Sequence, residues 1–388
     1  MDVRHCELFG HGCIPQRDSS KNTEKLFFTI RVTVARVKWG TGKAALMSDT
    51  QPERVRPTTL NDVAKLAGVS IATVSKALNG RGQVRAETRE RVLHAAERLK
   101  FTPNPLAQGL LAGRTGTVGL LTNDLEGRFS LPILMGAEDA FGAGSISVFL
   151  CDARGDAIRE QHHLKALISR RVDGLIVVGY RPEPRMSLGQ DIPVPIVYAY
   201  APSIDPRDTS VISDNTGAGA MAAEHLVLQG RTRIAYVGGD ITYSAATQRA
   251  DGAAARLAQH GLAFVGGEPL FGSWNEGWGR AAVRVLLSRH PDLDAIICGS
   301  DQIARGALDA LREAGRDVPG DIAVMGHDNW EQIATQSRPP LSTIDMNLEE
   351  LGRLAAELLF AAMDGAARPG IHSVPTRLVQ RSSTTLSS

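Results

Sequence analysis

The sequence predicts an α/β fold class: a two-lobed body of parallel, doubly wound sheets, preceded by an all-α helix-turn-helix module. Three observations predict this arrangement. Residues 58–101 hold short amphipathic helices separated by a glycine turn. Beyond Gly113, apolar strands alternate with amphipathic helices, which is typical of parallel sheets covered on both faces. The expected strands number about nine, more than one sheet usually holds, so we expect two lobes.

Residues 1–56 come first and show no regular period of apolar residues. We expect a disordered or dispensable leader, with translation beginning at Met47. His5, Cys6, His11 and Cys13 lie in this leader, but their spacing fits no zinc-ligand pattern, so no metal site is expected. The chain has four cysteines, too few for a disulfide framework at this length.

The helix-turn-helix module is expected over residues 57–102. Thr59 and Asp62 predict an N-cap with its acidic partner, and Gly68 supplies a tight turn after the first helix. Ser70 is expected to cap a second helix that ends near Leu78, and a third helix is expected over 86–99. Two helices joined by such a short turn place the second helix in the major groove of DNA.

Charge is distributed unevenly along the chain. Residues 57–115 carry nine Lys or Arg against four Asp or Glu, whereas residues 116–388 carry 24 against 32. A small basic segment on a larger acidic body favours nucleic-acid binding at one end only. No apolar run reaches the roughly 18–20 residues of a membrane helix, and the N-terminal residues lack the apolar stretch of a signal peptide. We therefore expect a cytoplasmic protein with no membrane partner.

The body is expected to alternate strands with helices in chain order. Seven of the expected strands can be placed, at 117–121, 146–151, 174–179, 196–200, 234–238, 295–299 and 322–326. The helices expected between them lie at 156–169, 216–228, 247–260, 279–288 and 302–314. In parallel sheets of this kind, a ligand binds beyond the carboxyl ends of the strands.

Several motifs resemble the lactose-repressor (LacI) family. The segment TLNDVAKLAGVSIATVSKALN spans residues 59–79, TRERV spans 88–92 and PNPLAQGL spans 103–110. The body continues the resemblance with RVDGLI at 171–176, DN at 214–215, SD at 300–301, VPGDIAV at 318–324 and GHDN at 326–329. The resemblance implies a sequence-specific transcriptional regulator, expected to be a repressor. Its body would be similar to periplasmic binding proteins and would respond to a small molecule.

By this resemblance, the second helix reads each half-site of a palindromic DNA operator, which requires a homodimer. Ile71 and Ala72 are expected to meet thymine methyl groups. Lys76 stands where the family usually has Arg; it keeps the charge but not the planar bidentate geometry. Residues expected to touch phosphates are Thr58, Ser70, Thr73, Ser75 and Asn79. Helix capping and solvation are the alternative explanation for these polar side chains.

The resemblance also implies a hinge helix and linker over residues 103–115 that fold on DNA, with Leu110 wedged into the minor groove. The expected DNA contacts of the hinge are Asn104, Ala107, Gln108 and Leu110. Gly109 inside this helix should weaken it by about 1 kcal/mol relative to Ala. Arg85 stands where a Ser often caps the third helix. This chain is therefore expected to lack that cap, and the Arg85 side chain is expected to contact a phosphate instead.

Residues 116–388 are expected to form a first lobe of 116–212 plus 338–364 and a second lobe of 213–337 plus the tail. By resemblance, the cleft between the lobes binds an effector that is a sugar or sugar derivative. The expected contacts are Asp124, Phe129, Arg249, Trp274, Ser300 and Asp328. An aromatic face would stack on C–H groups, while a guanidinium and a carboxylate would pair with hydroxyls. The structural alternatives are a surface ion pair of Arg249 with Asp251 and a core role for Trp274.

Two other functions compete with this interpretation. The segment GWGRAA at 277–282 superficially resembles a dinucleotide-binding loop, but no strand ends directly before it. Asp292 and Asp294 also fall too early for the acidic residue expected about 20 residues on, so we expect no enzyme, catalytic residue or cofactor. A sugar-binding transport protein would share the two-lobed body but would leave residues 58–113 unexplained. Residues 381–388 hold no leucine heptads, so a tetramer-forming tail is not expected.

Overall fold

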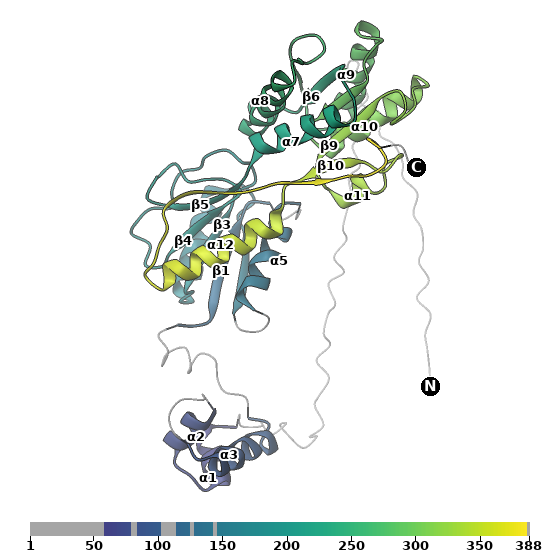
Figure 1. The fold of residues 1–388 in the computed structure, drawn as a ribbon. Coiled ribbons are helices and arrows are strands. Elements are labelled where there is room, and N and C mark those ends of the chain that lie inside the picture. Colours follow the sequence, from purple (N-terminus) through teal and green to yellow (C-terminus); the bar gives the residue numbers. More distant parts are fainter. Residues whose placement is uncertain (1–57, 79–83, 102–113, 125–127, 143–145, 386–388) are drawn as a thin grey trace, which may run out of the picture. The chain divides into compact units, whose positions relative to one another are not determined.

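The computed structural model describes residues 58–78, 84–101, 114–124, 128–142 and 146–385 (Figure 1). The expected leader, its start at Met47, and nearly all of the expected hinge lie outside these residues. The boundaries predicted for them therefore stay predictions.

The helix-turn-helix module consists of α1 (Leu60–Ala67), α2 (Ile71–Leu78) and α3 (Ala86–Arg98). The predicted cap of α1 is present as a capping box: the Asp62 amide donates to Thr59 Oγ1, and the Thr59 amide donates to Asp62 Oδ2 at 2.8 Å. Gly68 ends α1 with φ 65°, a left-handed conformation that suits glycine. Val63, Val74 and Val92, one from each helix, are fully buried in a common core.

The first lobe is built on a parallel sheet with the order β11-β5-β4-β3-β1-β2. Its strands are β1 (Thr117–Thr122), β2 (Ser147–Asp152), β3 (Gly174–Val178), β4 (Ile196–Ala199), β5 (Thr209–Ser213) and β11 (Gly370–Val374). Helices α5 (Ser130–Phe141) and α12 (Leu348–Met363) pack side by side on one face (Figure 1). Helix α6 (Ala157–Ser169) packs against β1 and β2. The sheet is therefore covered on both faces, as the alternating pattern predicts.

The second lobe repeats this plan with the order β12-β10-β9-β8-β6-β7, parallel throughout except for β12. Its strands are β6 (Ile234–Gly238), β7 (Leu270–Phe271), β8 (Ala295–Cys298), β9 (Ala323–Asp328), β10 (Ser342–Asp345) and β12 (Arg377–Val379). Helices α7 (Asn215–Leu228) and α8 (Ser244–Gln259) cover one face, and α9 (Glu276–Arg289) and α10 (Asp301–Glu313) cover the other. Along β6, Ile234 and Tyr236 face α7 and α8, while Ala235 and Val237 face α9 and α10.

The predicted fold class is confirmed, but the predicted lobe boundaries are partly wrong. The second segment of the first lobe was expected at 338–364; β10 belongs instead to the second lobe, and β11 to the first. The chain crosses between lobes near residues 213–215, at Met346–Asn347 and near 375–376. Strand β10 reads Ser-Thr-Ile-Asp and lacks the long apolar run of the central strands, which explains why the pattern gave no signal for it.

Reciprocal glycines let three pairs of helices approach closely. A Cβ built on Gly219 of α7 would lie 1.8 Å from the Arg249 carbonyl oxygen of α8, and one built on Gly252 would lie 2.0 Å from the Thr216 oxygen. The same exchange joins Gly136 with Gly352 between α5 and α12, and Gly279 with Gly306 between α9 and α10. Gly279 belongs to the segment that looks like a dinucleotide-binding loop, and here it serves helix packing.

Candidate functional site

A cavity of about 200 Å³ opens between the lobes, where strands from both sheets end. Tyr180 follows β3 and Tyr200 follows β4 in the first lobe, while Asp328 ends β9 in the second. The cavity is lined by Arg128, Phe129, Tyr180, Pro182, Tyr200, Tyr243, Ala245, Arg249, Trp274 and Asp328. This is the position expected for a ligand in parallel α/β sheets.

Backbone strain is concentrated at the strand ends on this cavity. Tyr200 has φ 72°, Asp328 has φ 108° and Asn329 has φ 53°, all in a region that L residues rarely adopt. Such conformations persist only where the surrounding structure enforces them, and they cluster at functional sites.

Asp328 pairs with one arginine from each lobe. In the second lobe, Arg249 Nη1 lies 3.7 Å from Asp328 Oδ1, and both side chains are about 5% exposed. From the first lobe, Arg128 donates through Nη2 to Asp328 Oδ2. Burial raises the pKa of the Asp328 carboxyl, and the two guanidinium groups oppose that rise.

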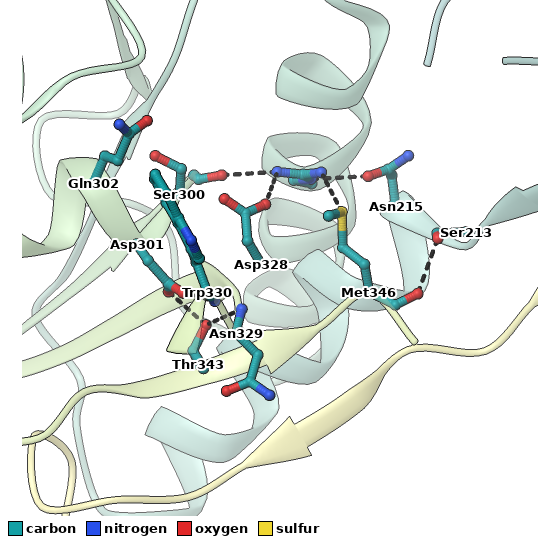
Figure 2. Close-up of polar contacts among 12 residues, drawn as sticks. Ser213, Asn215, Ser300, Asp301, Gln302, Asp328, Asn329, Trp330, Thr343 and Met346 are labelled. Carbon is teal, nitrogen blue, oxygen red and sulfur yellow. Dashed lines mark hydrogen bonds and ion pairs between the residues drawn. The ribbon is translucent and has the colours of Figure 1, made fainter. Parts of the chain in front are cut away.

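Arg249 is held by four groups, so its orientation is fixed before any ligand enters. Its Nε donates to Asn215 Oδ1 at 2.8 Å, its Nη1 donates to the Gly299 carbonyl oxygen at 2.8 Å, and its Nη2 lies 3.6 Å from Met346 Sδ. Three of its partners, Asn215, Asp328 and Met346, are labelled in Figure 2. Since Asn215 and Met346 belong to two of the three crossovers, Arg249 links the cavity to the segments that cross between the lobes. The alternative of a surface ion pair with Asp251 is wrong.

A second buried carboxyl supports the loop that carries Asp328. Asp301 is fully buried; it accepts hydrogen bonds from Thr343 Oγ1 at 2.6 Å and from the Trp330 amide at 2.7 Å (Figure 2). Burial, with the nearby charge of Asp328, raises the pKa of Asp301. His327 is also buried, and burial together with the two arginines lowers its pKa well below the usual 6.5.

The aromatic rings of the cavity already have neighbours on their faces. The Phe129 ring stacks on Tyr200 with centroids 4.7 Å apart, and the Arg128 guanidinium lies 5.0 Å from the centroid of the same ring. The Trp274 ring packs against Gly239, where a Cβ would come within 2.1 Å of it. Tyr243 meets Trp274 edge-on at 5.7 Å.

A second contact between the lobes lies beside the cavity. Glu183 of the first lobe accepts from the Ser244 amide of the second at 2.8 Å. The Arg181 guanidinium lies over the ring of Tyr243 at 4.6 Å. Contacts between the two lobes therefore lie directly beside the cavity.

Of the six residues expected to contact the effector, Phe129, Arg249, Trp274 and Asp328 line the cavity. Ser300 does not; it is buried and caps α10 through the Ile303 amide. Asp124 also lies outside the lining and accepts from the Phe129 amide at 3.1 Å. Sequence reasoning missed the lining residues Arg128, Tyr180, Tyr200 and Tyr243. Tyr180 could have been found from the strand-end rule, because it directly follows a predicted strand.

The predicted reading helix α2 presents apolar groups to its surroundings. Ile71 is 49% exposed, and Ala72 and Lys76 are exposed as well. Ser70 Oγ caps α2 by accepting from the Thr73 amide at 3.1 Å, and it also bonds the Thr73 hydroxyl.

The other predicted DNA contacts are placed as follows. Thr58 Oγ1 donates to the Leu99 carbonyl oxygen, and Ser75 is half-buried on α2. The remaining predicted contacts, Asn79, Asn104, Ala107, Gln108 and Leu110, lie outside the described residues. Arg85 precedes α3 and gives it no side-chain cap.

The described residues contain neither a metal-binding cluster nor a membrane-spanning helix. No cluster of three or more His, Cys, Asp or Glu suited to a metal ion occurs among them. Within the same residues, no helix is both long enough and apolar enough to span a bilayer.

A helix-turn-helix module and a two-lobed body with a cavity at its strand ends define a class, the ligand-responsive DNA-binding regulators. The profile described as "Bacterial regulatory proteins, lacI family" matches residues 59–104, and a periplasmic binding protein-like domain matches residues 223–384. The chain belongs to the LacI family, and it is a transcriptional regulator.

Relatives support this membership over nearly their whole length. The transcriptional repressor PurR of Mannheimia succiniciproducens is 32% identical over 84% of this chain and 98% of its own length. The Escherichia coli ribose operon repressor is 34% identical over 78% and 92%. Among solved structures, the lac repressor dimer bound to operator and the anti-inducer ONPF has a TM-score of 0.67 and 28% identity, covering 85% of this chain and all of that one. The complex of the regulator CelR with cellobiose has a TM-score of 0.56 and 32% identity, covering 84% and all of that chain.

Proposed function

We propose that this chain is a homodimeric repressor whose affinity for a palindromic operator is set by a compact sugar or sugar derivative bound between its lobes. The observation that supports this proposal most directly is the buried Asp328 on the wall of the cavity. It pairs with Arg249 of its own lobe and with Arg128 of the other lobe. Carboxylate and guanidinium groups in such a pocket pair well with hydroxyls. The volume of about 200 Å³ lies below the roughly 300–1,000 Å³ of drug-sized pockets, which favours a small ligand.

The comparisons support the sugar, the repressor role and the dimer in this proposal. The relative CelR is known as a complex with cellobiose, another relative represses a ribose operon, and a structural relative is a dimer on its operator. The residues proposed to contact the effector are Phe129, Arg249, Trp274 and Asp328. Asp124 and Ser300 support the site without lining it: Asp124 accepts from the Phe129 amide, and Ser300 caps α10. At α2, we propose that Ile71 and Ala72 read base edges and that Ser70 and Thr73 contact phosphates. Lys76 supplies positive charge there without bidentate base pairing.

The proposed mechanism is linkage between the cavity and the DNA. A ligand that engages Asp328 changes the surroundings of Arg249, which also holds Asn215 and Met346 at two crossovers. The effector thereby favours one arrangement of the lobes, and that arrangement sets the spacing of the two reading helices in the dimer. We propose that the chain has no catalytic activity and that it acts in the cytoplasm, where the operator lies. A transport function would leave the helix-turn-helix module without a role.

The test is a thermal-shift screen of the full chain against aldopentoses, aldohexoses and their polyols. A ligand present at 100 times its Kd stabilises the folded protein by about 2.7 kcal/mol. We expect one sugar to raise the unfolding midpoint by a few degrees, and Asp328→Asn to abolish this rise. Asp292→Asn serves as the control, because Asp292 forms an exposed ion pair with Arg233. Equal shifts in both variants would contradict the proposed site.

A further inference from the structure

Helix α8, which carries Arg249, receives its N-terminal cap from the other lobe. An α-helix leaves its first four N–H groups without a partner inside the helix. The residue directly before α8, Tyr243, provides no side-chain cap. Glu183 of the first lobe takes that role: its Oε1 accepts from the Ser244 amide at 2.8 Å and from the Ser244 hydroxyl at 3.3 Å. The capping of α8 therefore depends on how the two lobes are arranged.

The other long helices of the second lobe do not share this dependence. Each is capped by the residue directly before it: α7 by Asp214, α9 by Asn275 and α10 by Ser300. Those caps move with their helices, whatever the arrangement of the lobes. The group that caps α8 comes instead from a segment 61 residues earlier in the chain.

A second contact joins the same two segments. Residues 180–183 follow β3 of the first lobe, and the Arg181 guanidinium among them lies 4.6 Å from the centroid of the Tyr243 ring. Both contacts thus hold residues 180–183 against the start of α8. Tyr180, Pro182 and Tyr243 also line the cavity, so the joined segments form part of its wall.

We infer that Glu183 is a positioning residue: by capping α8 it favours the lobe arrangement of this structure, and it thereby tunes the response to the effector. This inference rests on the proposed function. The carboxylate also meets the positive end of the α8 dipole, which strengthens the contact. Since the cavity is lined from both lobes in this arrangement, an effector bound there favours the same arrangement. Without Glu183, fewer molecules adopt it before the effector binds, and the apparent affinity falls by the same factor.

Removing Glu183 also has a consequence for DNA binding that needs no effector. Because the effector and Glu183 favour one arrangement, losing Glu183 must change the Kd for the operator in the direction opposite to the change that the effector causes. Simple destabilisation would lower the fraction of folded protein and leave that Kd unchanged. The direction of the change therefore distinguishes a positioning role from a purely structural one.

Two substitutions break the contact from its two sides. Glu183→Ala removes the acceptor, and Ser244→Pro removes both donors. Proline is favoured at the first position of a helix, and the extended backbone of Tyr243 (φ −89°, ψ 122°) suits the residue before a proline. Glu183→Gln keeps an acceptor oxygen and is the conservative variant. Glu224→Ala is the control, because Glu224 pairs with Arg256 inside the second lobe.

The experiment uses the full chain and two measurements. Fluorescence anisotropy gives the Kd for DNA that the wild-type chain selects from random sequence, and calorimetry gives the Kd for aldopentoses and aldohexoses. We expect Glu183→Ala and Ser244→Pro each to weaken binding of the best sugar by roughly three- to thirtyfold, the range for loss of a helix cap. Each should shift the Kd for the operator in the direction opposite to the sugar.

The double variant tests whether the two substitutions remove one interaction. Glu183→Ala combined with Ser244→Pro should change both Kd values no further than either substitution alone. Glu183→Gln should lie between Glu183→Ala and wild type, and Glu224→Ala should match wild type. Thermal unfolding of each variant without ligand shows whether it has folded.

The outcomes separate the inference from the proposed function. If a sugar binds the wild-type chain but Glu183→Ala binds it as tightly as Glu224→Ala does, the positioning role is overturned while the sugar site stands. Additive effects of Glu183→Ala and Ser244→Pro, or a shift of the Kd for the operator in the same direction as the sugar, would also overturn it. If none of the sugars binds the wild-type chain, the proposed function falls and the operator measurements alone decide. Equal, non-additive shifts then support the role of Glu183, and unchanged values overturn it.

Discussion

The guanidinium of Arg249 and the carboxylate of Asp328 form a buried pair with 3.7 Å between Nη1 and Oδ1, and the same guanidinium bonds Asn215 and Met346. The pair thus lies between the cavity and two of the three segments that cross from lobe to lobe. A single side chain can sense a ligand and influence the lobe arrangement at once.

Replacing Arg249 should destabilise the folded protein strongly. Arg249→Met leaves the Gly299 carbonyl oxygen and Asn215 Oδ1 without their donor and removes one partner of the buried Asp328. Breaking a buried ion pair in this way typically costs roughly 3–5 kcal/mol of unfolding free energy. Urea unfolding measures the loss, with Arg233→Met as an exposed control. A loss below about 1 kcal/mol would show that the pair contributes little to stability.

Stability should depend on pH through His327. Burial and the neighbouring arginines lower the pKa of His327 well below 6.5, so the folded protein keeps the ring neutral. The unfolded chain takes up a proton below about pH 6.5, which stabilises the unfolded state. The free energy of unfolding therefore falls as the pH drops through this range, by up to about 1.4 kcal/mol per pH unit. The contribution of His327 is isolated by comparing the free energy of unfolding of wild type and His327→Gln at pH 7.5, 6 and 5. If the two proteins lose the same free energy as the pH falls, the prediction is refuted.

Two glycines of α9 should respond differently to the same substitution. A Cβ on Gly279 would lie 2.1 Å from the Ile303 backbone oxygen, whereas one on Gly277 meets only the Asn275 side chain at 3.3 Å. Gly279→Ala should lower the free energy of unfolding by about 1–3 kcal/mol through overpacking. Gly277→Ala should leave it unchanged or raise it by up to about 1 kcal/mol. Equal effects in thermal unfolding would contradict the packing role of Gly279.

Ile71 should matter for DNA binding and little for folding. Because its side chain is half exposed, Ile71→Ala should change the free energy of unfolding by less than about 0.5 kcal/mol. Loss of a base contact should weaken binding to the operator by roughly 1–3 kcal/mol, about five- to 150-fold. The probe is the sequence that the wild-type chain selects from random DNA, measured by fluorescence anisotropy. Leu93→Ala, at an exposed position on α3, is the control; a similar loss there would argue against a specific role of Ile71.

The sequence predicts the central strands and the reading helix well because each has a strong local pattern. The fully buried β3 is a continuous apolar run, and the reading helix α2 follows its capping residue Ser70. Helix α5 was missed because Pro132 and Gly136 resemble helix breakers. In fact Pro132 lies in the first turn, where proline is tolerated, and Gly136 permits contact with α12.

The cavity could be predicted only in part. Asp328 lies in a motif that resembles the family, and Arg249 was carried over by position from the same resemblance; both line the cavity. Arg128 was missed because its partners, Asp328 and Gln302, belong to the other lobe and no local pattern connects them. The same holds for Glu183, since its partner Ser244 also belongs to the other lobe.

The most direct test of the account is the operator affinity of the full chain with and without a saturating sugar, for wild type and Asp328→Asn. We expect the sugar to change the wild-type affinity by roughly five- to 150-fold and to leave the variant unchanged. By linkage, the operator must change the affinity of the wild-type chain for the sugar by the same factor. If the wild-type chain binds both the sugar and the operator while neither alters the affinity for the other, the proposed coupling is contradicted.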